Sequence, residues 1–154
     1  IRYVQAFTTN KNRKFNVEDT ATVSLFFKSG ALCTLNISDT IVAPWSYELT
    51  AGENPVYPIT NQSAYMIGGT KGSLQFPNLK YWFYKKERSW WNKISFNEVK
   101  NKRDDNTLVN QINHFADVVA KKTKPKVNGN DGLLSLKIFA AITKSAKTGK
   151  KIKI

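Results

Sequence analysis

The sequence predicts an α+β fold: an open, mainly antiparallel β-sheet with two C-terminal helices packed on one face. Three observations support this prediction. In the first two thirds of the chain, short runs alternate between apolar and polar residues, as strands do. After Asn106 the apolar residues recur with the period of a helix. Clusters of glycine, proline and asparagine separate the runs, as turns require.

The clearest strand signal is a hairpin near the start of the chain. Residues 19–27 and 31–38 alternate on either side of the turn Lys28-Ser29-Gly30. Val23 and Leu25 belong to the apolar face of the first run. Further strands are expected at residues 1–8, 46–50, 64–67, 73–76, 80–84 and 93–98. Gly68-Gly69-Thr70-Lys71-Gly72 is expected to be a turn between two of them.

Two helices are expected in the last third. The first ends before Pro125 and follows Asp104 and Asp105, whose charges favour a helix start. Its apolar stripe consists of Leu108, Ile112, Phe115 and Val119. The second spans residues 132–147, with Asn130 or Asp131 as its N-cap and Gly149 at its end. Its buried side is expected to hold Leu134, Ile138, Ala141 and Ile142.

Composition limits the class of protein. A chain of 154 residues has the length of one domain. Its only cysteine, Cys33, excludes an intrachain disulfide and a zinc cluster and suits a reducing compartment. The chain has no run of about 18 apolar residues, so no membrane span is expected. The expected location is the cytoplasm. The net charge of +13 comes from scattered lysines, which favours a solvated surface; a basic patch that binds nucleic acid is the alternative.

The chain holds no self-contained active site. The glycines do not form G-x-G-x-x-G, and no P-loop is present, so no dinucleotide site is expected. Cys33 is expected to pack inside a strand. His114 is the only histidine; packing is the favoured interpretation, with a substrate contact or a general base as the alternative. The first residue is Ile1 rather than methionine, so we expect a further segment ahead of it.

Several segments carry a resemblance to a known family. Residues 17–21 and 27–32 resemble the opening hairpin of the C-terminal domain of the Gfo/Idh/MocA oxidoreductases, and residues 38–54 resemble one of its subgroups. The turn of residues 68–74 lies where that family has its G-T-x-G-S-L motif. His114-Phe115, residues 129–133, Ser145-Ala146 and Thr148-Gly149 follow in the family's order. Together they span nearly the whole chain.

The resemblance implies a two-domain enzyme in which residues 1–154 form one substrate-side and assembly domain. An N-terminal Rossmann domain, absent from this chain, would bind NAD or NADP. Hydride would move between the nicotinamide and a hydroxyl-bearing carbon of a sugar, inositol or related polyol. The family's E-K-P and D-x-x-x-H motifs have no match here, so this chain carries no catalytic, cofactor-binding or metal-binding residue of its own and is expected to be inactive alone.

The resemblance places substrate contacts in residues 39–57. Asp39 and Glu48 would accept hydrogen bonds from sugar hydroxyls, Trp45 would pack on a pyranose face, and Asn54 or Tyr57 would orient it. The alternative is that Trp45 and Tyr47 are anchors of the loop and that Asp39 holds a turn.

The same family often pairs copies through its sheet. Exposed aromatic residues would supply this homo-oligomer interface: Trp82, Phe83, Trp90 and Trp91. Two alternatives to an oxidoreductase domain remain open, a basic module in which aromatic residues stack on nucleic acid bases and a stand-alone assembly domain.

Overall fold

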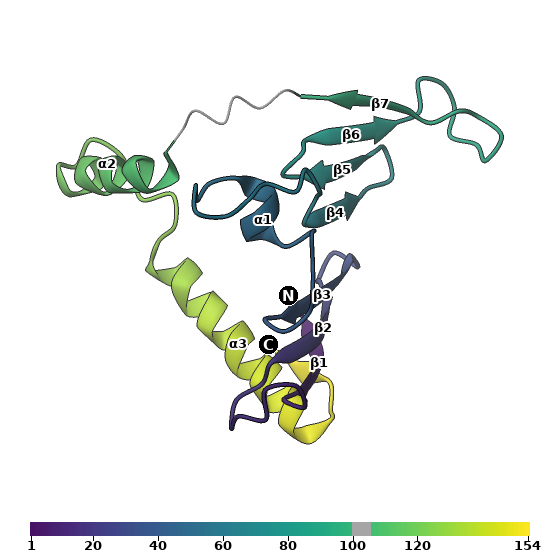
Figure 1. Cartoon of the computed structure of the whole chain (residues 1–154). Helices are drawn as coiled ribbons and strands as arrows, with labels where there is room; N and C mark the ends of the chain where they lie inside the picture. Colours follow the sequence, from purple (N-terminus) through teal and green to yellow (C-terminus); the bar gives the residue numbers. More distant parts are fainter. Residues whose placement is uncertain (100–105) are drawn as a thin grey trace. The chain divides into compact units, whose positions relative to one another are not determined.

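The computed structural model describes residues 1–99 and 106–154 (Figure 1). They form two compact units, one of Ile1–Val42 with Lys124–Ile154 and one of Ala43–Thr123. Each unit contains a four-stranded antiparallel sheet. The α+β class is confirmed, but the strands lie in two sheets rather than in the one sheet expected. Alternation along a strand shows which side chains share a face, not which strands pair.

The sheet of the first unit has the strand order β3-β2-β1-β8. Its strands are β1 (Tyr3–Thr9), β2 (Thr20–Phe26), β3 (Leu32–Ser38) and β8 (Ile152–Lys153). The predicted hairpin is β2-β3, and Phe26 pairs with Leu32 beside its turn. Gly30 adopts a φ of 90° there, a conformation that glycine reaches without steric cost. The short strand β8 was not predicted.

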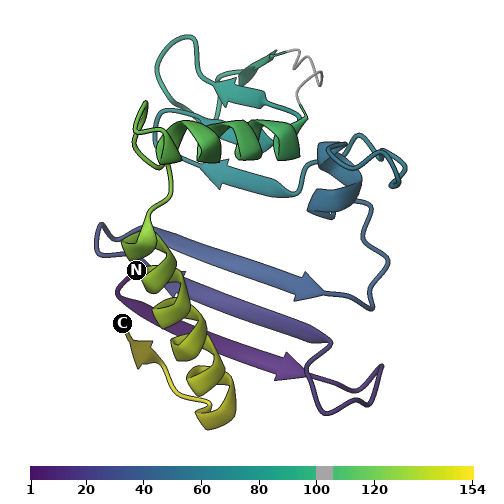
Figure 2. The same ribbon diagram turned by 90° about the vertical axis from the view of Figure 1, so that its left-hand side faces the viewer.

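Helix α3 (Gly129–Thr148) lies against one face of this sheet (Figure 2). Its side chain Ala141 is buried with residues of β1 and β2: Val4, Ala6, Val23 and Leu25. Cys33, Ile138 and Ile142 pack against this core, as the sequence predicts, whereas Leu134 is 47% exposed. Burial of each large aliphatic side chain contributes about 1.5–3 kcal/mol, so this layer accounts for much of the stability of the unit.

The start of α3 differs from the prediction. Its N-cap is Asn128, not Asn130 or Asp131, and its first turn begins at Gly129. The Asn128 side chain accepts hydrogen bonds from the backbone N–H groups of Asn130 and Asp131, and the Asp131 carboxylate accepts one from the backbone of Asn128. This capping box offsets the low helix propensity of Gly129 and Gly132. Because of that low propensity, the sequence predicts a later start for this helix. Gly149 ends the helix as predicted, with a φ of 68°.

Ser145 joins α3 to the sheet. It is fully buried, and its Oγ accepts a hydrogen bond from the backbone N–H of Ala6 at 3.0 Å and donates one to the carbonyl of Lys150 at 2.6 Å. Strand β8 pairs only with Tyr3 and Val4, so beyond Val4 this edge of β1 has no neighbouring strand. Ser145 therefore satisfies a buried backbone donor that the sheet leaves open.

The second unit begins with a short helix and continues as a sheet with the order β4-β5-β6-β7. Its elements are α1 (Tyr47–Ala51), β4 (Tyr65–Gly68), β5 (Ser73–Phe76), β6 (Lys80–Phe83), β7 (Ser95–Glu98) and α2 (Thr107–Val119). The strand expected at residues 46–50 is wrong. Glu48 in the first turn and Gly52 in the left-handed conformation at the C-cap favour a helix there over the β propensity of Tyr47 and Thr50.

Helix α2 is where the sequence predicts it, but its stripe is exposed. Asn106 caps it by accepting from the backbone N–H groups of Leu108 and Val109. None of its residues is buried, and the stripe side chains are 66–69% exposed. Asp104 and Asp105 lie outside the described residues. Across residues 1–99 and 106–154, no helix is long and apolar enough to cross a membrane.

Candidate functional site

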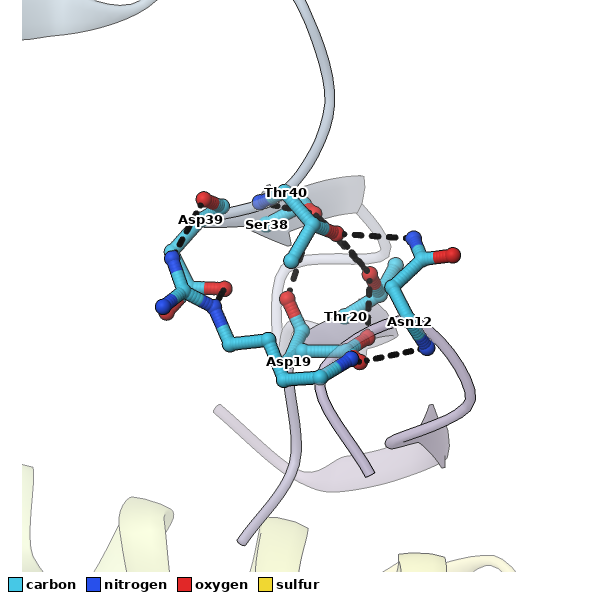
Figure 3. Close-up of polar contacts among 7 residues, drawn as sticks. Asn12, Asp19, Thr20, Ser38, Asp39 and Thr40 are labelled. Atoms are coloured by element: carbon cyan, nitrogen blue, oxygen red, sulfur yellow. Dashed lines mark hydrogen bonds and ion pairs between the residues drawn. The ribbon is translucent and has the colours of Figure 1, made fainter. Parts of the chain in front are cut away.

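A polar cluster lies where β2 begins and β3 ends (Figure 3). These two strand ends lie at the same edge because the strands are antiparallel, and Thr20 pairs with Ser38. Asp19, just before β2, is 4% exposed. Its Oδ2 accepts hydrogen bonds from the backbone N–H groups of Asn12 and Arg13, both at 3.0 Å, and its Oδ1 accepts one from Thr20 Oγ1. Asp19 thus holds the preceding loop over the edge of the sheet.

The charge of Asp19 is stabilised by its partners. The backbone N–H of Arg13 is the main cause that lowers the pKa of this carboxyl; burial opposes it, and the Thr20 hydroxyl and the Asn12 backbone assist. Asp19 is therefore ionised at neutral pH. Because both of its oxygens are engaged within the fold, its role in this cluster is to position Arg13.

Arg13 in turn binds Asp39. Its Nε lies 3.1 Å from Asp39 Oδ1 and its Nη2 donates to the Asp39 carbonyl at 3.0 Å. Both side chains are about half exposed, at 45% and 61%. Among the described residues, none donates a hydrogen bond to the second carboxylate oxygen, Asp39 Oδ2. The site therefore offers one oriented, charged acceptor to a ligand hydroxyl.

Hydroxyl groups complete the cluster. Ser38 Oγ lies 2.9 Å from Thr20 Oγ1 and 3.1 Å from Thr40 Oγ1, and Asn12 Nδ2 donates to Thr40 Oγ1 at 3.0 Å. These groups pair with one another, so they fix the shape of the edge. Asp39 remains the member best placed to bind a partner outside the cluster.

A cavity of about 400 Å³ opens beside this cluster within the first unit. This volume falls in the usual range for small-molecule sites. Its polar end includes Asp19, Thr20, Ser38 and Asp39. The remaining wall is supplied by β1, the loop before β2, β2, β3 and α3: Thr8, Glu18, Ala21, Val23, Ile37, Phe139, Ile142, Thr143 and Ala146. The cavity suits a ligand with both apolar surface and hydroxyl groups.

The other predicted substrate residues belong to the second unit. Trp45, just ahead of α1, is 54% exposed, and Glu48 is exposed in the first turn of α1. Asn54 and Tyr57 share one turn, in which Asn54 Oδ1 accepts from the backbone N–H of Val56 and the Asn54 carbonyl accepts from that of Tyr57. Asn54 thus shapes the turn, while Trp45, Glu48 and Tyr57 keep exposed surface for a ligand.

Tyr47 anchors this segment. The centroid of its ring lies 5.9 Å from that of the Tyr65 ring and 6.2 Å from that of the Phe76 ring. These ring contacts hold α1 against β4 and β5. Its hydroxyl donates to Glu53 at 2.8 Å, and this hydrogen bond, with burial, raises the pKa of Tyr47 to about 12. The alternative that Tyr47 is a loop anchor fits this geometry.

Arg13 and Asp19 are not among the site residues that the sequence predicts. Asp19 carries one local signal, a carboxylate at the first position of an otherwise apolar alternating run. Arg13 carries none, because a loop that folds back on a strand end has no periodicity.

The described residues do not fit a dinucleotide or a metal ion. The glycine-rich turn of residues 69–72 joins two strands, β4 and β5, whereas a dinucleotide cradle joins a strand to a helix. Within the described ranges, no group of three His, Cys, Asp or Glu side chains could hold a metal.

The family follows from a match over the whole fold. The model of the Gfo/Idh/MocA group, described as "oxidoreductase family, C-terminal alpha/beta domain", matches residues 2–154. The chain belongs to this family. The resemblance seen in the sequence is thereby confirmed, and this oxidoreductase domain gives no support to the nucleic-acid alternative.

Solved structures share the fold of this oxidoreductase domain. The WlbA dehydrogenase from Bordetella pertussis, in complex with NADH and UDP-GlcNAcA, has a TM-score of 0.64 at 20% identity over 99% of this chain and 40% of its own. The aldose-aldose oxidoreductase from Caulobacter crescentus, complexed with glycerol, has a TM-score of 0.62 at 20% identity over 99% and 41%.

A third structure extends the comparison. It is an oxidoreductase from Agrobacterium radiobacter with NAD+, L-tartaric acid and magnesium, with a TM-score of 0.65 at 15% identity over 99% of this chain and 43% of its own. The chain thus spans about two fifths of the length of these structures. No curated protein matches it in sequence.

Proposed function

We propose that this chain is the substrate-binding and assembly domain of an NAD(P)-dependent oxidoreductase that acts on a sugar, inositol or related polyol. The observation that carries the proposal is the family match over residues 2–154. Residues 1–154 act as one substrate-side domain, and a Rossmann domain of the full-length enzyme binds NAD or NADP and supplies the catalytic groups. The domain acts in the cytoplasm, a proposal supported by the lone Cys33.

The ligands of the similar structures support the substrate class. Glycerol, UDP-GlcNAcA and L-tartaric acid all carry several hydroxyl groups. A hydroxyl that leaves water needs a hydrogen-bond partner, and a charged acceptor gives the stronger bond. Asp39 Oδ2 is such an acceptor in this chain.

The roles of the site residues follow from their exposure. In the first unit, Asp39 accepts a hydrogen bond from a hydroxyl of a polyol. In the second unit, taken by itself, Glu48 accepts such a hydrogen bond and Trp45 packs on the apolar face of a sugar ring. Tyr57 orients the ligand from the turn that Asn54 shapes. Arg13 is a positioning residue, since it holds Asp39 by two contacts.

We further propose a homo-oligomer through the aromatic surface of the second unit. Trp90 and Trp91 are 97% and 95% exposed, and large exposed apolar side chains mark interaction surfaces. Trp82 and Phe83 are partly buried and contribute less free surface to it.

Binding to this chain tests the polyol site. In a titration with myo-inositol, glucose and glycerol, followed by 15N NMR, we expect the Arg13 Nε–H and Trp45 Nε1–H signals to shift and to saturate. Cyclohexanol, which has a ring but a single hydroxyl, serves as the control ligand. If no polyol of the panel moves either signal, the substrate role of this domain is wrong.

The variant Asp39→Asn should weaken polyol binding by about tenfold, because a neutral amide replaces the charged acceptor. Its folding should be nearly unchanged, since the exposed Arg13–Asp39 ion pair contributes only about 0–1 kcal/mol. Asp117→Asn is the matched control, because Asp117 is also an exposed, ion-paired carboxylate. Equal affinities of the two variants would contradict the role of Asp39.

A further inference from the structure

A second, smaller cavity lies in the second unit beside the turn of residues 69–72. Its volume is about 90 Å³, well below the range of about 300–1,000 Å³ of sites that enclose a whole small molecule. It is therefore sized for one functional group. Its lining comes from the turn, from the start of β5, from β6 and from the loop after β6: residues 69–73 and 82–84, Arg88 and Ile94.

The charged groups that line this cavity are all positive. Lys71 and Arg88 contribute them, and no carboxylate belongs to the lining. Among the described residues, neither cation has an ion-pair partner, since the pairs found there involve other side chains. Thr70 and Ser73 add hydroxyl groups to the same wall. The cavity thus has the electrostatics of an anion site.

Trp82 supplies an independent observation. It lines the cavity, and its indole Nε1 is buried without a hydrogen-bond partner in the described structure. A buried N–H without an acceptor is costly, and such groups are rare in folded proteins. The ring is held in place by Phe96 on β7, with ring centroids 4.9 Å apart. Indole N–H is a donor only, so the ligand that satisfies it must bring an acceptor.

The walls of the cavity are built by the fold. A Cβ on Gly72 would lie 2.6 Å from both Cε2 and the hydroxyl oxygen of Tyr81 and 2.8 Å from the Trp82 carbonyl oxygen, so only glycine lets the turn approach β6 this closely. The loop that carries Arg88 is closed by two hydrogen bonds of Asn92, to the carbonyls of Glu87 and Ser89. Glu87 takes part in closing this loop through its carbonyl, and it does not line the cavity.

The small cavity shares two residues with a larger one. The neighbouring cavity, of about 360 Å³, is lined by Tyr84, Arg88, Ser89 and Trp90. Tyr84 and Arg88 line both cavities. A ligand with its anionic group in the small cavity can therefore place its organic part against Tyr84.

We propose that these adjoining cavities bind a small phosphorylated organic molecule. Its phosphate group lies in the small cavity, where it accepts hydrogen bonds from Trp82 Nε1, the hydroxyls of Thr70 and Ser73 and the Arg88 guanidinium. Arginine suits this role because its planar fork can donate two parallel hydrogen bonds to a phosphate. This proposal does not depend on the polyol site around Asp39, so either proposal can be disproved without the other.

The indole N–H signals test this proposal directly. The chain contains four tryptophans, and Trp82→Phe identifies the Trp82 signal in a 15N spectrum by its loss. We expect inorganic phosphate to move this signal with a saturable dependence, and glycerol 3-phosphate to do so at lower concentration. A phosphate monoester that binds no more tightly than inorganic phosphate would identify a site for the free ion instead of an organic ligand.

Two variants and one salt control make the test decisive. Arg88→Ala should weaken phosphate binding by at least tenfold, and Arg88→Lys should retain part of it. Lys93→Ala is the matched control, because Lys93 is an exposed cation of the same loop that does not line the cavity. The proposal is overturned if chloride at equal ionic strength moves the Trp82 signal as much as phosphate, or if Arg88→Ala and Lys93→Ala weaken binding equally.

Discussion

Asp19 positions the residues of the candidate polyol site. It binds the backbone of Asn12 and Arg13 and so determines where the Arg13 guanidinium meets Asp39. Asparagine at this position would keep the size of the side chain, but it is neutral and would therefore weaken the hydrogen bonds from the backbone N–H groups of Asn12 and Arg13. The site is thus built on one buried charge at the edge of the sheet.

This arrangement makes stability depend on pH at the acidic end. The folded state lowers the pKa of Asp19 below its ordinary value of 3.8, so its stabilisation is complete above that value and is lost as the pH falls through 3.8 and past the lower folded pKa. Asp19→Asn should lower the free energy of unfolding at pH 7 and flatten its dependence on pH in this acidic window. Urea denaturation at several pH values measures both, and an unchanged slope relative to the wild type would contradict the assignment.

At the level of the elements, Ser145 is the link between α3 and β1. Ser145→Ala would leave the Ala6 N–H and the Lys150 carbonyl without their partner, at a cost of about 1–3 kcal/mol in the free energy of unfolding. Chemical denaturation measures this change.

Ser135→Ala is the matched control in the same helix. The Ser135 hydroxyl is exposed and donates only to the Asp131 carbonyl, so its loss should change stability by no more than a few tenths of a kcal/mol. Equal effects of the two variants would show that Ser145 does not tie the helix to the sheet.

The elements that the sequence predicts well are those with local signals. The β2-β3 hairpin has alternation on both sides of a glycine turn, and α2 and the end of α3 have helical spacing and a cap. Strand β8 has only two residues and exists because it pairs with β1, about 150 residues earlier in the chain. Helix α1 has one turn, which is too short for a period to be seen.

The candidate site is predictable from the sequence only where its residues carry a local signal. Asp39 and Trp45 were named because the family resemblance covers their segment, and they stay predictions as ligand contacts. The Arg13–Asp39 ion pair joins residues 26 positions apart, through a loop whose course no pattern reveals. The division of the strands into two sheets likewise depends on pairing between residues far apart in the chain.

For the whole molecule, we propose that substrate binding and cofactor binding belong to different domains of the enzyme. This chain spans about two fifths of the similar oxidoreductase structures, and its described residues offer acceptors for hydroxyl groups but no cradle for a dinucleotide. The cluster around Asp39 lies in the first unit and the proposed phosphate site in the second, so a phosphorylated ligand need not be the substrate.

The most direct test is the formation of reduced nicotinamide by the full-length protein. With NAD+ or NADP+ and a panel of sugars, inositols and linear polyols, we expect at least one polyol to yield NADH or NADPH at a rate that saturates with its concentration. Absence of reduced nicotinamide with every polyol, and of its oxidation with the corresponding ketones or aldehydes, would contradict the account.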